Sequence, residues 1–185
     1  MNIIVKPYGS ELCHCRPDTT WERENKDYYV PDCVDSLHWT PIIFVRISKA
    51  GKCIGDKFVS RYYDSFNFGA LIYCRIKDKE ELMSISCADH TSLLPAPLYN
   101  PVVMDNEDAL FEVFRNEERI FGGKALKSQI EEAVCKASRL ISLRTGDFVA
   151  VELSDQQMAA SRSEGEVRFS ATFCEKNLFD LKLIF

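Results

Sequence analysis

An α+β fold, rich in strands and with one long amphipathic helix, is predicted for this sequence of 185 residues. Three observations predict it. Runs of β-branched and aromatic residues recur along the chain, the C-terminal part alternates apolar and polar residues, and one segment has the apolar spacing of a helix. The sequence has no internal repeat and no low-complexity tract, so we expect one domain over residues 1–185.

The elements follow from these patterns in chain order. Residues 8–36 are polar and contain Pro17 and Pro31, and we expect a long irregular excursion on the surface there. Runs typical of strands then occupy residues 41–47, 66–76, 110–114, 148–153, 165–173 and 178–185, and Asn116-Glu117 is expected to be a turn. One helix is predicted over about 125–143, where apolar residues recur at steps of three and four: Leu126, Ile130, Val134, Ala137 and Ile141.

The charge balance excludes some partner classes. With 23 Lys and Arg against 28 Asp and Glu, the formal net charge is −5, and no basic run is present to neutralise phosphates. No apolar stretch reaches the roughly 20 residues of a membrane span, and the apolar start of the chain is too short for a signal-peptide core. We therefore expect a cytoplasmic protein without nucleic-acid or membrane partners.

The eight cysteines are the one unusual count. No C-x-x-C pair of the kind that binds zinc occurs, and the expected compartment is reducing, so we expect free thiols with several acting as small buried apolar side chains. Only Cys13-His14-Cys15 is dense, and an extended chain would place its imidazole opposite the two thiols, which makes a poor chelate.

An ordered set of short motifs spans residues 6 to 175. The set comprises Lys6-Pro7, Leu37-His38-Trp39, Gly51-Lys52, Tyr62-Tyr63-Asp64, Gly69, Asn116-Glu117, the helix and Leu143-Arg144-Thr145-Gly146-Asp147. Each motif is weak alone, and the order resembles the core domain of the fumarylacetoacetate hydrolase family. The resemblance implies a mixed β-roll or β-sandwich of that type, and a homodimer.

The resemblance also implies a chemistry. Members of the family cleave, isomerise or decarboxylate acids with a 1,3-dicarbonyl unit, using a divalent cation such as Mg²⁺ or Ca²⁺ as Lewis acid. The family's ligands are a Glu-x-Glu pair on one strand and an Asp on a later strand. The two glutamates reach one ion because residues i and i+2 of a strand face the same way.

This sequence departs from the family at those positions. Thr40 and Ile42 stand where the two glutamates are expected, and Leu71 stands where the aspartate is expected. Arg75 matches an arginine at the end of the same stretch. Without three anionic ligands a dication has little electrostatic reason to bind, so we expect no cofactor, and Ile42 and Leu71 are expected to fill a dry pocket.

Candidate site residues follow from this alignment. No catalytic residue is assigned, and His14 and His38 are the weak candidates, with a structural role as the alternative for each. Arg75 is the candidate to pair with a small carboxylate ligand, with a surface or interface salt bridge as its alternative. The remaining pocket candidates are Tyr73, Asp89, Thr40, Ile42 and Leu71.

Two functions remain open at this point. The first is an enzyme of the family type, acting on a dicarbonyl acid through a relocated or absent metal. The second is a non-catalytic homodimer that uses the same pocket for binding or scaffolding. An unrelated β-rich domain with coincidental turns is the alternative to both.

Overall fold

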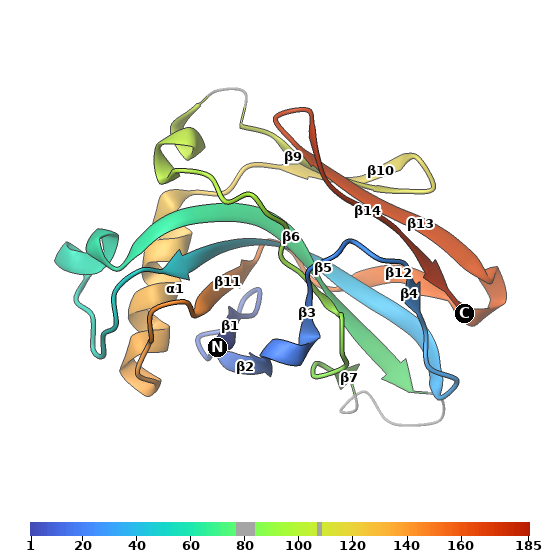
Figure 1. The fold of residues 1–185 in the computed structure, drawn as a ribbon, viewed down its shortest axis with the longest axis horizontal. Helices are drawn as coiled ribbons and strands as arrows, with labels where there is room; N and C mark the ends of the chain where they lie inside the picture. The colour runs from blue at the N-terminus through green and yellow to red at the C-terminus, as the bar shows by residue number, and fades with distance from the viewer. Residues whose placement is uncertain (77–83, 107–108) are drawn as a thin grey trace.

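A computed structural model describes residues 1–76, 84–106 and 109–185 and consists of two β-sheets that face one another, with one helix at one end (Figure 1). The larger sheet, which we call the large sheet, has the strand order β2-β1-β11-β5-β6-β8-β3, with β12 pairing with β5 and β7 with β6. Its strands are β1 (Asn2–Lys6), β2 (His14–Pro17), β3 (Trp21–Glu22), β5 (Val34–Ile47), β6 (Tyr63–Ile76), β7 (Ser84–Ile85), β8 (Ser92–Leu93), β11 (Phe148–Glu152) and β12 (Gln157–Ser161).

The second sheet, the small sheet, has the order β10-β9-β13-β14-β4. Its strands are β4 (Tyr28–Tyr29), β9 (Phe111–Arg115), β10 (Glu118–Gly123), β13 (Glu166–Phe173) and β14 (Lys176–Ile184). The helix α1 (Lys127–Leu140) packs against β11 and the 3-10 turn at residues 56–61, and buries Ile130 and Val134. The chain therefore builds two layers with the helix closing one end.

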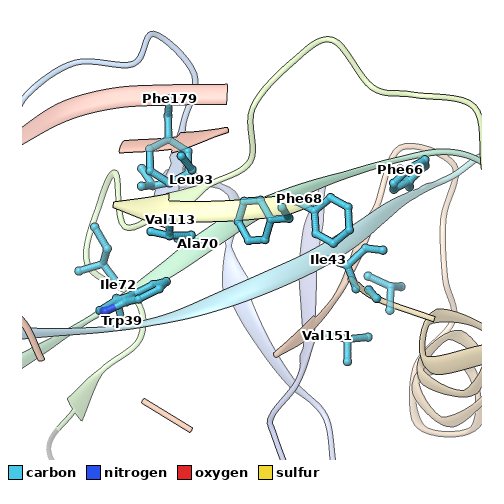
Figure 2. Close-up of a cluster of buried hydrophobic side chains, with 14 of the residues drawn as sticks. Trp39, Ile43, Phe66, Phe68, Ala70, Ile72, Leu93, Val113, Val151 and Phe179 are labelled. Atoms are coloured by element: carbon cyan, nitrogen blue, oxygen red, sulfur yellow. The ribbon is translucent and has the colours of Figure 1, made fainter. Parts of the chain in front are cut away.

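The main core lies between the two sheets (Figure 2). Side chains of β5 and β6 point from the large sheet toward the small sheet, where Trp39 meets Phe169, and Phe66 and Phe68 meet Phe173. The rings of Phe68 and Phe111 stack with centroids 4.8 Å apart. Burial of these aromatic side chains holds the two sheets together.

The opposite face of the large sheet is also apolar. Its buried residues form a second cluster: Ile3, Val5, Ile42, Phe44, Leu71, Tyr73, Leu94, Phe148 and Ala150. The large sheet curls around this cluster, since Arg16 on β2 reaches the carbonyl oxygen of Ile72 on β6 although three strands separate β2 from β6. We call this side the concave face.

Most predicted elements are confirmed. The helix expected at about 125–143 is α1, and each predicted strand overlaps an observed one, with β5 and β6 beginning earlier than expected. Asn116 and Glu117 form the predicted turn and have φ angles of 47° and 71°. The α+β, β-rich class with one long helix is confirmed.

Two expectations were wrong. Residues 8–36 are not simply an irregular surface excursion, because they contribute β2, β3 and β4 and bury Arg16, Thr20 and Glu22. The polar composition concealed this because the strands are only two to four residues long and β2 and β3 bury charged side chains. The cysteines are all free as expected, but only Cys74 and Cys135 are buried, so most of them do not fill the core.

No helix within residues 1–76, 84–106 and 109–185 combines the length and the hydropathy that a membrane crossing requires.

Candidate functional site

The concave face brings together the positions where the resemblance places metal ligands. Thr40 on β5 lies directly opposite Leu71 on β6, and Ile42 is two residues further along β5 on the same face. Ile42 and Leu71 are both 0 % exposed and belong to one apolar cluster. The ring of Phe44 in this cluster meets Phe148 edge-on at 5.5 Å, so the space is filled by side chains.

The hydroxyl of Thr40 is also engaged. Its Oγ1 donates a hydrogen bond of 2.8 Å to the carbonyl oxygen of Ser154, in the segment after β11. Thr40 is completely buried, so this bond satisfies a group that would otherwise lack water.

These residues do not fit the divalent cation that the family resemblance implies. Mg²⁺ and Ca²⁺ require several oxygen ligands, mostly carboxylates and carbonyls. Ile42 and Leu71 offer no donor atom, and the Thr40 hydroxyl is neutral and already bonded. Within the described part of the chain, no group of three or more His, Cys, Asp or Glu side chains is arranged to hold a metal ion.

The concave face also carries a set of buried polar side chains, which we call the polar set: Arg16, Tyr73 and Glu152. Glu152, at the end of β11, lies directly opposite Ile42 and accepts a hydrogen bond of 2.5 Å from the Tyr73 hydroxyl. Its second oxygen accepts from the backbone N–H of Tyr8 at 3.0 Å. The Arg16 guanidinium lies over the Tyr73 ring, 5.0 Å from its centroid.

The Arg16 side chain is held at one end only. Its Nη2 donates to the carbonyl oxygen of Ile72 at 2.9 Å and to Oγ1 of Thr91 at 2.6 Å. Arg16 is 1 % exposed, yet its Nε and Nη1 have no hydrogen-bond partner among the described residues, and neither has Nε2 of His14. Buried donors without a protein partner are costly, and an acceptor beside them, such as a buried water or a ligand oxygen, would satisfy them.

Burial shifts the pKa values of the ionisable side chains on the concave face. It raises the pKa of Glu152, against the opposing effects of the Tyr73 hydrogen bond and the Arg16 charge. It also raises the pKa of Tyr73, and the neighbouring Glu152 carboxylate acts in the same direction. Burial lowers the pKa of His14, and the positive charge of Arg16 lowers it further. The Tyr73 phenol therefore remains protonated and keeps donating to Glu152.

The other candidates from the sequence lie around this set or away from it. His14 on β2 pairs with Val5 and faces the concave side, and His38 on β5 lies opposite Tyr73. Nη2 of Arg75 donates to Oε1 of Gln156 at 3.0 Å. Asp89 lies apart from the concave face and lines hollows at the edge of the two sheets.

Arg16 and Glu152 are site residues that the sequence did not single out. Arg16 lies in a polar segment with no strand pattern, and its burial depends on contacts to Ile72 and Thr91, which are far away in the chain. Glu152 did carry a signal, since it is the one charge in the apolar run Phe148–Glu152. A charge inside a strand buried along its whole length needs a specific partner.

We next compared the sequence and the structure with known proteins. No family model matches the sequence, and no curated protein matches it. The structure is similar to fumarylpyruvate hydrolase from Pseudomonas aeruginosa in complex with Mn²⁺ and pyruvate, with a TM-score of 0.78 and 14 % identity, over 100 % of this chain and 90 % of that one. A Yersinia pestis protein described as a fumarylacetoacetate hydrolase family protein gives a TM-score of 0.76 at 13 % identity, over 99 % and 92 % of the two chains.

The chain has the fold of the fumarylacetoacetate hydrolase family. A third structure, 5-carboxymethyl-2-hydroxymuconate delta-isomerase from Mycobacterium smegmatis, gives a TM-score of 0.75 at 13 % identity, over 99 % of this chain and 78 % of that one. Hydrolases and an isomerase thus share this architecture. At such low identity the likeness establishes the fold, and function has to be argued from the residues of this chain.

Proposed function

We propose that this chain is a divergent fumarylacetoacetate hydrolase-type protein that works without the divalent metal, as a binding protein rather than as a metal-dependent hydrolase or isomerase. One observation carries the proposal. Ile42 and Leu71, at the positions where the resemblance places carboxylates, lie fully buried in one apolar cluster. A dication at this point would lose its hydration shell and gain no anionic ligand.

The ligand that best suits this face is a small carboxylate. Arg16 supports this choice, because its unpartnered Nε and Nη1 can donate to a carboxylate oxygen. The fumarylpyruvate hydrolase of similar fold was solved with pyruvate, which makes pyruvate a suitable probe. Arg75 is the second cationic candidate for binding the carboxylate.

We further propose that the protein is a homodimer. We also propose that it lies in the cytoplasm, where eight free thiols would stay reduced.

Thermal unfolding tests the proposal directly. Millimolar Mg²⁺, Mn²⁺ or Ca²⁺ should leave Tm unchanged, because a ligand raises stability only if it binds the folded state. Pyruvate without metal should raise Tm, and Arg16→Gln should abolish that rise. Arg46→Gln is the control, since Arg46 is half-exposed and pairs with Asp64 at the surface.

The chemistry of the family defines the result that would contradict this proposal. Turnover of acylpyruvates or oxaloacetate, together with a metal-dependent rise in Tm of several degrees, would overturn the proposal and establish the enzyme instead. Sedimentation analysis in the same buffers tests the homodimer. A species of 21.2 kDa at all concentrations would exclude it.

A further inference from the structure

Two hollows adjoin one another beside the concave face, where the edge of the large sheet meets β4 of the small sheet, and Trp21 of the first hollow packs against the concave cluster. One has a volume of about 430 Å³ and the other about 460 Å³. Both are lined by Glu22, Lys26, Asp89 and His90, so they meet at these four side chains. We call this place the seam. It shares no residue with the polar set of Arg16, Tyr73 and Glu152.

A histidine and a buried carboxylate form the centre of the seam. Nδ1 of His90 lies 2.8 Å from Oε2 of Glu22, whose side chain is 7 % exposed, whereas that of His90 is 62 % exposed. Oε1 of Glu22 accepts from the backbone N–H of Glu24 at 2.7 Å. In the neutral imidazole, a carboxylate fixed in this way selects the tautomer with hydrogen on Nδ1, which leaves the lone pair on Nε2.

The backbone around His90 is fixed by hydrogen bonds. The backbone N–H of His90 donates to the carbonyl oxygen of Thr19 at 3.2 Å, and His90 has a φ of 60°, in the left-handed region. The next residue, Thr91, donates to the carbonyl oxygen of Ala88 and accepts from Arg16. The 88–91 turn is therefore tied to buried groups, and the imidazole is a preorganised acceptor.

The walls of the seam define the ligand class. Five carboxylates line the two hollows against two permanent cations: Asp18, Glu22, Glu24, Asp27 and Asp89 against Arg23 and Lys26. Lys26 is paired with Glu24, so four carboxylates remain against Arg23. Tyr28, Tyr29 and Pro31 add flat apolar surface to the second hollow. This combination favours a planar ligand that is positively charged and donates hydrogen bonds.

We propose that the seam binds a small planar organic cation, such as an aromatic amidinium or amine, with an N–H of the ligand donating to Nε2 of His90. Asp89 contributes charge attraction beside it, and the tyrosine rings pack on the ligand's apolar part. Glu22 acts as a positioning residue, since it fixes the tautomer and orientation of His90. This site prefers the opposite ligand charge to the one proposed for the concave face.

The test uses benzamidine and benzoate, which have the same shape and opposite charge. The chain has three histidines, and His90→Gln identifies the signals of His90 in a ¹⁵N-detected spectrum of the imidazoles. In the free protein His90 should show the Nδ1–H tautomer. Benzamidine should shift the His90 signals with a Kd on the order of 1 mM, and benzoate should leave them unchanged.

A matched pair of variants tests the role of Glu22. Glu22→Gln should change the tautomer distribution of His90 and weaken benzamidine binding about tenfold, whereas Glu117→Gln, at an exposed turn, should change neither. The proposal is overturned if benzoate shifts His90 as strongly as benzamidine, or if benzamidine leaves His90 unchanged. Both outcomes are read on the unaltered protein, and His90→Gln serves only to assign the signals. The pyruvate experiment probes Arg16, and either site can fail without the other.

Discussion

At the level of single residues, the concave face buries two ionisable side chains of opposite type, Glu152 and Arg16. An unpaired carboxylate or guanidinium in such a place would be strongly destabilising. Glu152 is compensated by two hydrogen bonds, from Tyr73 and from the Tyr8 backbone. Arg16 is compensated in part, because its Nη2 donates to two carbonyl oxygens and a hydroxyl and its guanidinium lies over the Tyr73 ring, while Nε and Nη1 have no partner among the described residues. Tyr73 therefore links the two charges, and the arrangement persists without a metal ion.

The raised pKa of Glu152 makes stability depend on pH in a defined direction. Because the folded state holds this proton more tightly than the unfolded chain does, ionisation of Glu152 lowers the free energy of unfolding as pH rises above the ordinary glutamate value of 4.5. Glu152→Gln removes the titration. The difference in unfolding free energy between the protein and this variant should therefore shift in favour of the variant as pH increases from 4.5.

Urea unfolding at a series of pH values from 4 to 8 measures that difference. Glu118→Gln, at an exposed position, serves as the control and should show no such trend. A difference between the protein and Glu152→Gln that stays constant over the whole range would contradict the prediction. A constant offset is expected in addition, because a glutamine cannot accept from both Tyr73 and the Tyr8 backbone as the carboxylate does.

At the level of elements, β5 illustrates why strand boundaries were harder to predict than strands. The sequence predicts a start at Pro41, whereas β5 runs from Val34. A proline interrupts a ladder because it lacks an N–H. Pro41 lies where the partner of β5 changes. On this side β12 pairs with residues 36–39 of β5, and β11 pairs with residues 42–46. The proline is accommodated at that junction, which only the tertiary structure reveals.

The close antiparallel pairing of β6 with β8 depends on a glycine. A Cβ added at Gly69 would lie 2.1 Å from the carbonyl oxygen of Leu93, which is a backbone atom and cannot move aside cheaply. Gly69→Ala should therefore lower the free energy of unfolding by about 3 kcal/mol, measured by urea denaturation. Gly55→Ala is the control, since nothing lies within 4 Å of its added Cβ, and it should change stability by less than about 0.5 kcal/mol. Equal effects of the two would refute the close approach.

At the level of the whole molecule, the fold was more predictable than the site. Strand and helix periodicity is a local property, so Leu126 to Ile141 or residues 165–173 can be assigned from neighbours alone. The polar set combines three residues from three distant strands, β2, β6 and β11. The seam likewise joins Glu22 to His90 through a contact of 2.8 Å between Oε2 and Nδ1 that no local pattern encodes. The ordered motifs predicted which positions meet on the concave face, but not which new side chains join them.

Whether the two sheets behave as one unit depends on the aromatic contacts between them. Phe173 on β13 is completely buried and meets Phe66 and Phe68 of β6 at centroid distances of 6.0 Å and 4.9 Å. Phe173→Ala should lower the free energy of unfolding by about 4 kcal/mol, because it removes a large ring from a closed core. Phe58→Ala provides the control, since Phe58 is 52 % exposed and its loss should cost less than about 1 kcal/mol.

Both sheets contribute to this core, so they should also unfold together. Trp39 of the large sheet contacts Phe169 of the small sheet edge-on at 5.2 Å, which makes tryptophan fluorescence sensitive to separation of the layers. The fluorescence and far-ultraviolet circular dichroism transitions should coincide in urea. If Phe173→Ala displaces only one of the two transitions, the sheets are separate folding units. If both move together, the interface between them limits the stability of the whole chain.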